Sequence, residues 1–531
     1  MKKVNRTGRR AIAAGSAVAV ATVLLAACSG ASSSNSAGST GATASTGSTG
    51  SSSANPGGTL VFGISADPTQ MIPWTTTAEQ SVQVLSQIYS TLLTTDQSGN
   101  LVPGLSALPV VSNGGDTYTF TLKSGVKFTG GTALTSADVK YTFDTIMKPS
   151  SDASGASFFE SVASVAAPNP TTVVVHMKHP DASFPSGLST IETGIVPTGS
   201  TATGLAAKPD GTGPYEFVSQ VPNESITLQR NPDYYAGKPG AATLEFRVIP
   251  DDQSMVSALR TGAVDVAIFS DPVTAKTATS GSVAIDKVGS LQYHVLQLRA
   301  ASPVLANVNA RLAIQCAISR QGVVDSAALG AGTITGPITS PSYRSNPSDQ
   351  PCPTQNLTKA KQYLAKAGEP SGFTLNLITS QGLYASAVDE AQAVQAQLGA
   401  IGIKVNVQSL SASAYVSDWL AGNFEAAIAE NSGNIDPNTM YARYFTTGGT
   451  YNKVAGYSSP TLNTLFAEGI ATTDVAKRQS IYQQISAQLV DNAVWIWLYT
   501  PESYIAVNTS VSGFDARTDA DLSMLWKASI S

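Results

Sequence analysis

The sequence predicts an α/β protein, because helix and strand patterns alternate along the chain. An Ala- and Gln-rich helix over residues 385–400 precedes a strand over 403–410 that alternates apolar and polar residues. The same order returns with a helix over 474–492 and a strand over 494–500. More than 470 residues follow position 56, too many for one hydrophobic core. Two or three subdomains are therefore expected.

Earlier parts of the chain carry similar patterns. Residues 59–66 predict a strand, and residues 79–92 predict a helix. Apolar residues alternate with threonine over 118–122, which indicates a strand with one buried face. A capping-box-like start at Thr135-Ser136-Ala137-Asp138 opens a further helix, and a strand is expected over 171–177.

The N-terminus has the pattern of an export signal. Five basic residues precede an apolar stretch that is too short for a confident membrane span. Leu25-Ala26-Ala27-Cys28 resembles the lipobox of bacterial lipoproteins. We therefore expect a signal peptide over 1–27 and lipid attachment at Cys28, at the extracytoplasmic face of the cell membrane. The alternative is an ordinary cleavage site that happens to contain cysteine.

Residues 28–56 consist almost entirely of Ser, Gly, Thr and Ala, which predicts a flexible tether. Removal of residues 1–27 would leave 26 basic against 36 acidic residues, a net charge of about −10. This balance argues against a nucleic-acid partner, which requires a basic face. Attachment through lipid is the expected contact with the membrane.

Cys316 and Cys352 remain as a pair once Cys28 is assigned to lipidation. In an oxidising compartment such a pair favours a disulfide. Alternatively, Cys316 is a small buried residue of an apolar helix.

Enzyme and metal signatures are absent from the sequence. The folded part contains no nucleophile-elbow, zinc-protease, Walker or zinc-spacing motif. His176 and His179 invite a nickel interpretation, but surface histidines at a strand end explain them better. No cofactor and no metal site are expected.

Five segments, in this order and spacing, carry a resemblance to a known family. They are residues 92–144, 211–240, 248–269, 357–368 and 396–407. Together they closely resemble the family 5 extracellular solute-binding proteins, the peptide, nickel and opine class that serves ABC importers.

The resemblance implies a two-lobed, type II periplasmic-binding-protein-like clamp with an extra subdomain inserted in lobe I. By analogy, lobe I comprises 57–91, 200–285 and 500–531, the inserted subdomain 92–199, and lobe II 286–499. Hinges are expected near 285–292 and 498–502.

The resemblance also implies a function without catalysis. A monomeric binding protein would capture a small solute, most simply a short peptide, and deliver it to an ABC permease with its ATPase subunits. The alternatives are a secreted lipoprotein hydrolase or lyase on the same scaffold, a signalling or adhesion receptor, and a binder of nickel, opines or another small solute.

A loop around Asn434-Ile435-Asp436-Pro437 resembles the ligand-proximal loop of the family. Peptide receptors hold the ligand ammonium with an acidic residue just upstream, whereas this chain has Ser432-Gly433-Asn434 there. Asn434 and Asp436 are therefore candidate ligand contacts, and Glu430 is a possible substitute. Alternatively, Asp436 only caps a turn before Pro437.

Aromatic residues form the second group of candidates. Rigid rings bury a large area at low entropic cost, so they suit the walls of a ligand cleft. Core packing is the alternative for each ring. The candidates are Trp74, Tyr384, Trp419, Tyr444 and Trp497.

Overall fold

The computed structural model describes residues 57–530. The expected signal peptide, Cys28 and the tether lie outside the described residues. Within 57–530, no helix combines the length and the apolar composition needed to cross a bilayer.

One sheet of 12 strands organises the fold, with the main path β16-β15-β17-β13-β18-β11-β1-β10-β9-β8 and with β12 and β14 paired to β18. Strand β18 (Trp495–Asn508) is its longest member. The other strands are β1 (Thr59–Ile64), β8 (Tyr215–Val221), β9 (Ser225–Arg230), β10 (Thr243–Val248), β11 (Val266–Phe269), β12 (Val283–Gly289), β13 (Tyr293–Leu298), β14 (Gly332–Ile334), β15 (Thr374–Gln381), β16 (Lys404–Ser411) and β17 (Ala426–Asn431).

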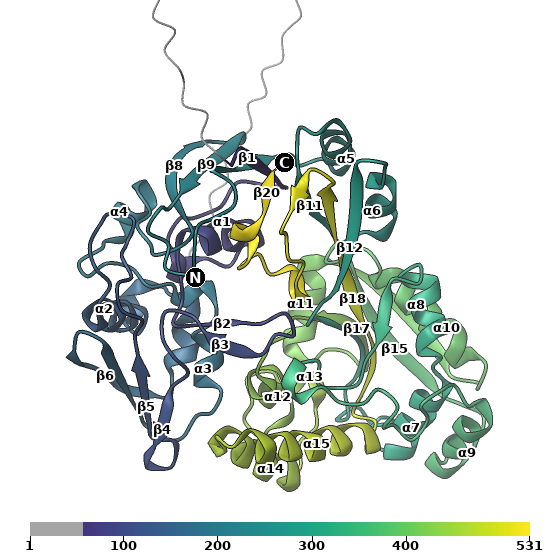
Figure 1. Ribbon diagram of the computed structural model, residues 1–531. Coiled ribbons are helices and arrows are strands. Elements are labelled where there is room, and N and C mark those ends of the chain that lie inside the picture. The colour runs from purple at the N-terminus through teal and green to yellow at the C-terminus, as the bar shows by residue number, and fades with distance from the viewer. Residues whose placement is uncertain (1–56, 531) are drawn as a thin grey trace, which may run out of the picture. The chain divides into compact units, whose positions relative to one another are not determined.

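Strand β18 belongs to both halves of this sheet, as Figure 1 shows in yellow. Residues 495–501 pair with β13 and β14, whereas residues 502–508 pair with β12 and residues 504–507 also with β11. The chain also passes between the halves through residues 290–292, which join β12 to β13. The two halves are therefore connected by β18 and by this crossing segment.

A second sheet lies in the part of the chain between α1 and β8. Its order is β4-β5-β7-β6, formed by β4 (Val110–Ser112), β5 (Thr117–Thr121), β6 (Val162–Asn169) and β7 (Thr172–Met177). Tyr118, Phe120 and Leu122 are buried while Thr121 is exposed, which confirms the predicted alternation. Two short pairs complete the strands: β2 (Leu93–Thr95) with β3 (Leu101–Pro103), and β19 (Val511–Ser512) with β20 (Ser529–Ile530).

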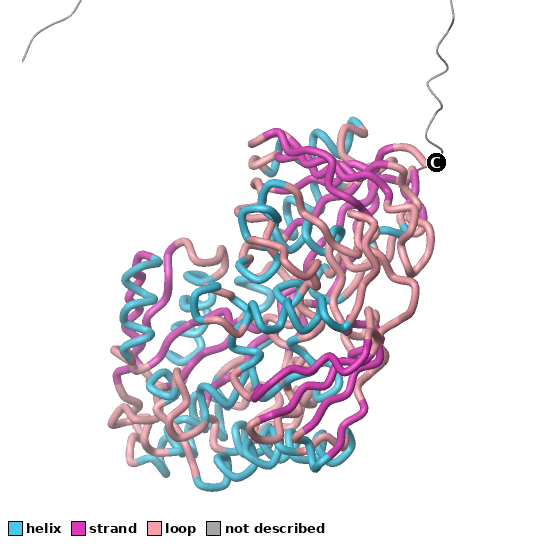
Figure 2. The backbone as a smooth tube through the Cα atoms, turned by 90° about the vertical axis from the view of Figure 1, so that its left-hand side faces the viewer, coloured by secondary structure: helices cyan, strands magenta, loops and turns pink. Residues whose placement is uncertain are grey.

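Helices pack against these groups of strands, as Figure 2 shows. They are α1 (Glu79–Ile88), α2 (Ser136–Ile146), α3 (Phe184–Gly187), α4 (Ala202–Ala207), α5 (Asp252–Thr261), α6 (Pro272–Ala278), α7 (Val308–Ala317), α8 (Arg320–Ala327), α9 (Leu357–Ala367), α10 (Ala387–Gly399), α11 (Ala412–Ala421), α12 (Pro437–Phe445), α13 (Asn452–Ala455), α14 (Pro460–Ala471) and α15 (Val475–Asp491).

Local chemistry explains where several helices begin and end. The capping box of α2 is formed, because Thr135 and Asp138 satisfy each other's backbone groups. Helix α5 starts at the Asp251 cap and ends at Gly262, whose φ of 73° is left-handed. Ile481, Ile485 and Leu489 of α15 are buried, as their spacing predicts.

Two boundaries differ from the prediction. Helix α1 ends at Ile88 rather than near Leu92, because Tyr89 is extended and Leu93 starts β2. The Gly213 amide donates a hydrogen bond to the Ile88 carbonyl, which satisfies this carbonyl at the end of the helix. Strand β18 continues to Asn508, since residues beyond 500 gain a new set of partner strands.

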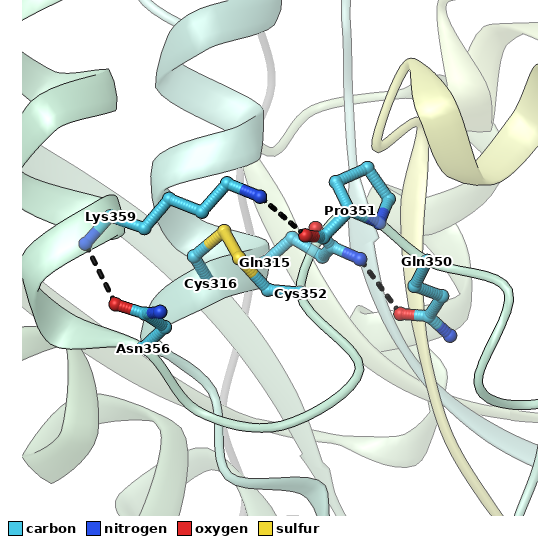
Figure 3. Close-up of a disulfide and its surroundings, with 7 residues drawn as sticks. All are labelled: Gln315, Cys316, Gln350, Pro351, Cys352, Asn356 and Lys359. Atoms are coloured by element: carbon cyan, nitrogen blue, oxygen red, sulfur yellow. Dashed lines mark hydrogen bonds between the residues drawn. A yellow bond between two sulfur atoms is a disulfide. The ribbon is translucent and has the colours of Figure 1, made fainter.

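A disulfide joins Cys316 of α7 to Cys352, across 36 residues of sequence (Figure 3). Both cysteines are buried in the apolar cluster that covers one face of β15 and β17. Next to it, Lys359 donates through Nζ to the Pro351 carbonyl at 2.7 Å. The bond thus fixes the segment before α9 against α7.

We expect the double variant Cys316→Ser/Cys352→Ser to be less stable by about 2–4 kcal/mol, because the cross-link removes loop-closure entropy from the unfolded chain. Chemical denaturation of the oxidised protein and of the variant measures the difference. Reduced wild-type protein is the control and should match the variant. Equal midpoints for oxidised and reduced protein would contradict the expectation.

Candidate functional site

A cavity of about 640 Å³ opens among segments from distant parts of the chain. One side is formed by α1, by the β2–β3 hairpin and by residues 189–192. Residues 234–236 and the C-terminal segment 518–527 add a second wall. Leu291 and residues 433–435 close it from the other half of the large sheet. The cavity therefore lies where the two sheet halves meet.

Two of the carboxylates that line this cavity interact electrostatically, those of Glu79 and Asp519. Glu79 opens α1, and Asp519 lies in the short 3-10 turn Thr518–Ala520. Burial of the carboxyl raises the pKa of Glu79, and the negative charge of Asp519 raises it further, although the side chain as a whole is exposed. Glu79 therefore loses its proton less readily than a carboxyl group in water.

Asp519 also holds the crossing segment. Its Oδ1 accepts from Ser290 Oγ at 2.9 Å and from the Leu291 amide at 3.4 Å. Asp519 and Ala520 both have left-handed backbone, with φ of 63° and 51°. The same carboxylate therefore contacts the cavity and the link between the sheet halves.

Lysines and aromatic rings also line the cavity. Lys123 Nζ lies 5.0 Å from the centre of the Tyr235 ring, and burial lowers the Lys123 pKa. Tyr234 contacts both Tyr235 and Trp526, with ring centres 4.8 and 5.3 Å apart. Among residues 57–530, Lys123 forms no ion pair. The cavity thus offers a cation, carboxylates and apolar ring surface together.

The loop that contributes Asn434 is held in place from several sides. Ser340 Oγ donates to the Asn434 carbonyl at 2.6 Å, and the Asp436 amide donates to Asn434 Oδ1 at 2.8 Å. Gly433 lies against the backbone of Leu291, so a Cβ at this position would collide with the Leu291 carbonyl. Within the stretch 432–434, position 433 therefore has no room for any side chain, a carboxylate included.

Asn434 is the one predicted ligand contact among the cavity-lining residues. Asp436 instead caps α12 through its Oδ1, which accepts from the Asn438 amide at 2.8 Å. Its Oδ2 accepts from Arg478 Nη1 at 2.6 Å, with each side chain only 4% exposed. The turn-capping alternative describes this residue, because both oxygens already have hydrogen-bond partners within the protein.

The aromatic candidates lie away from the cavity wall. Trp74, Tyr444 and Trp497 are 3%, 2% and 1% exposed and pack in hydrophobic clusters. Trp419 is half-buried and donates through Nε1 to Gln297 at 2.6 Å. In this structure these rings pack in or against the hydrophobic core, as the alternative interpretation expects. Ligand contact by them stays a prediction.

Tyr384 and Glu430 belong to a separate buried group around His294. His294 Nδ1 lies 2.8 Å from Glu390 and Nε2 lies 3.6 Å from Glu430, although the first approach is too misaligned for a hydrogen bond. The Tyr384 ring meets the imidazole edge-on at 5.1 Å. Burial raises the pKa of Glu430, and Glu390 adds to this while His294 opposes it.

Metal binding finds no support in the described part of the chain. His176 and His179 are both exposed near the end of β7. No group of three or more His, Cys, Asp or Glu side chains within 57–530 is placed to hold a metal ion.

Sequence reasoning missed the cavity residues outside the 433–435 loop. Glu79 and Asp519 are brought together by the fold and not by any local pattern, and Tyr235 and Trp526 likewise. Residues 516–531 lie beyond the segments that carried the family resemblance, so no motif marked them.

Comparison with known proteins identifies the family. The model of the bacterial extracellular solute-binding proteins, family 5 Middle, matches residues 100–452, more than half of the chain. The oligopeptide-binding protein AppA of Bacillus subtilis is 27% identical over 497 residues, covering 88% of this chain and 90% of AppA. The glutathione-binding protein GsiB of Pectobacterium atrosepticum is 26% identical over 485 residues, covering 86% and 92%.

Solved structures agree on the fold. The structure of HbpA2 from Haemophilus parasuis covers 89% of this chain and 100% of its own, with a TM-score of 0.81 and 24% identity. The predicted two-lobed α/β class is confirmed. Members of the family are transport binding proteins that act outside the cytoplasm, so the hydrolase alternative is set aside. The chain belongs to the bacterial extracellular solute-binding proteins of family 5.

Proposed function

We propose that this binding protein captures a short peptide in the cavity and delivers it to an ABC permease from a lipid-anchored, monomeric state. The observation that carries the ligand assignment is the mixed lining of the cavity, which includes the carboxylates of Glu79 and Asp519 and the ammonium group of Lys123. A peptide carries both an ammonium group and a carboxylate, so a lining with charges of both signs suits it. Relatives named for oligopeptide and glutathione binding support the same class.

The lobes are proposed to follow the two halves of the large sheet. Residues 57–91, 200–285 and 500–531 would form lobe I, residues 286–499 lobe II, and residues 92–199 the inserted subdomain. The passages at 290–292 and near Pro501 support hinges there, because the described backbone passes between the halves at these two places. Closure would then bring the Asn434 loop toward the lobe I wall.

The anchor is proposed to be diacylglycerol on Cys28, with residues 28–56 as the tether. More than one acyl chain makes such attachment stable, whereas a single chain is marginal. A tethered receptor can close on its ligand and still reach a permease in the same membrane.

We expect the purified protein to bind peptides of about two to five residues, the size range that suits a pocket of this class. Ligand binding would alter tryptophan fluorescence and compact the molecule in small-angle scattering, because domain closure accompanies binding. A pool blocked at both termini by acetylation and amidation is the control. If neither pool produces a response, and native mass spectrometry finds no retained peptide, the peptide assignment is contradicted.

We expect Glu79→Gln to weaken binding of peptides with a free amino terminus by about two- to five-fold, the range of a partly exposed charge pair. The wild-type affinity should rise as pH increases through the raised Glu79 pKa and level off above it, because an ammonium ligand binds the ionised carboxylate. Calorimetry across pH measures both effects.

The matched control is Glu224→Gln, which removes a charge in the exposed β8–β9 turn away from the cavity. It should leave both the affinity and its pH profile unchanged. A pH profile of Glu79→Gln identical to wild type would contradict the role of Glu79.

A further inference from the structure

Arg478 is a buried cation in the first turns of α15. Its side chain is 4% exposed, and each guanidinium nitrogen has a partner. Nε donates to the Gly469 carbonyl at 2.7 Å, Nη1 to Asp436 at 2.6 Å and to Tyr343 Oη at 2.9 Å, and Nη2 to Tyr482 Oη at 3.4 Å. Burying an ion pair costs desolvation free energy, so helix packing alone does not explain why this pair is present.

The pair with Asp436 leads directly to the cavity wall. Asp436 uses Oδ2 for Arg478 and Oδ1 for the start of α12, so its carboxylate cannot rotate freely. Its backbone amide then donates to Asn434 Oδ1 at 2.8 Å. The guanidinium of Arg478 thereby fixes the side-chain amide of Asn434 indirectly, through Asp436.

A second route from the same turns of α15 reaches the Asn434 backbone. Arg478 holds Tyr343, and the neighbouring Gln479 donates to the Ser342 carbonyl at 2.8 Å. These contacts fix the turn at Pro341–Tyr343. Ser340, which precedes this turn, donates to the Asn434 carbonyl at 2.6 Å.

We propose that Arg478 is a positioning residue for ligand binding, which fixes both the amide side chain and the carbonyl of Asn434 in the cavity wall. It acts through Asp436 and through the turn that carries Ser340, without touching the ligand itself. The inference rests on the proposed function, because it takes the cavity as the ligand site. Lysine cannot replace arginine here, since one ammonium cannot serve partners in these separate directions.

Arg320 provides a matched control on α8. It is also buried, at 7% exposure, and donates to the carbonyls of Thr335, Pro347 and Pro353. None of these residues lines the cavity. Arg320→Lys should therefore lower stability as Arg478→Lys does, but without moving Asn434.

The test compares peptide affinity by calorimetry in Arg478→Lys and Arg320→Lys. We expect about ten-fold weaker binding for Arg478→Lys and a change below about two-fold for Arg320→Lys. Equal losses, or no loss in either variant, overturn the proposal. Ser340→Ala is the milder second variant and should weaken binding about three-fold through the other route, so the test does not depend on whether Arg478→Lys folds.

Hydrogen exchange gives a readout that needs no ligand. The amides of Asp436 and Asn438 should exchange about ten-fold faster in Arg478→Lys and at the wild-type rate in Arg320→Lys. Unchanged exchange in Arg478→Lys overturns the proposal. If wild-type protein binds no peptide while exchange responds as expected, the ligand assignment fails and the positioning role stands.

Discussion

The shared strand β18 is the constraint on which the rest of the structure depends. A central strand must satisfy its backbone groups on both sides, and β18 does so with four partner strands in two sets. The change of partners falls near Pro501, a residue without an amide proton, and the Pro501 carbonyl accepts from the Ser290 amide at 3.1 Å. The register of both sheet halves follows from this one strand.

The cavity lies at the same junction, which explains its composition. Leu291 in the crossing segment donates to Asp519, accepts from Thr339 Oγ1 at 2.7 Å and packs on Gly433. Residues from α1 and from the C-terminus line the same cavity as the Asn434 loop, and Leu291 lines it with them. The crossing segment is therefore in direct contact with cavity-lining groups from both halves, Asp519 and Gly433.

Sequence patterns predicted the elements whose apolar residues repeat regularly, such as the alternation at Tyr118 and Phe120 and the buried stripe of α15. They failed where an element's end or a residue's burial depends on contacts with residues far away in the sequence. The end of α1 depends on Gly213, more than a hundred residues away. Arg478 lies between Lys477 and Gln479, which suggests a solvent face, and its burial depends on the distant Asp436 and Tyr343. An aromatic residue such as Trp74 carries no signal for whether it faces a core or a cavity, and Glu79 meets Asp519 only in the folded chain.

The two left-handed residues Asp519 and Ala520 introduce local backbone strain beside the cavity. Each costs on the order of 1–2 kcal/mol relative to right-handed backbone, more for alanine, which lacks a polar group to compensate. The hydrogen bonds that the Asp519 carboxylate accepts from Ser290 and Leu291 help to hold this strained backbone in place. A ligand that bound this carboxylate would compete with Ser290 and Leu291 for it, so a single side chain links the contents of the cavity to the crossing segment.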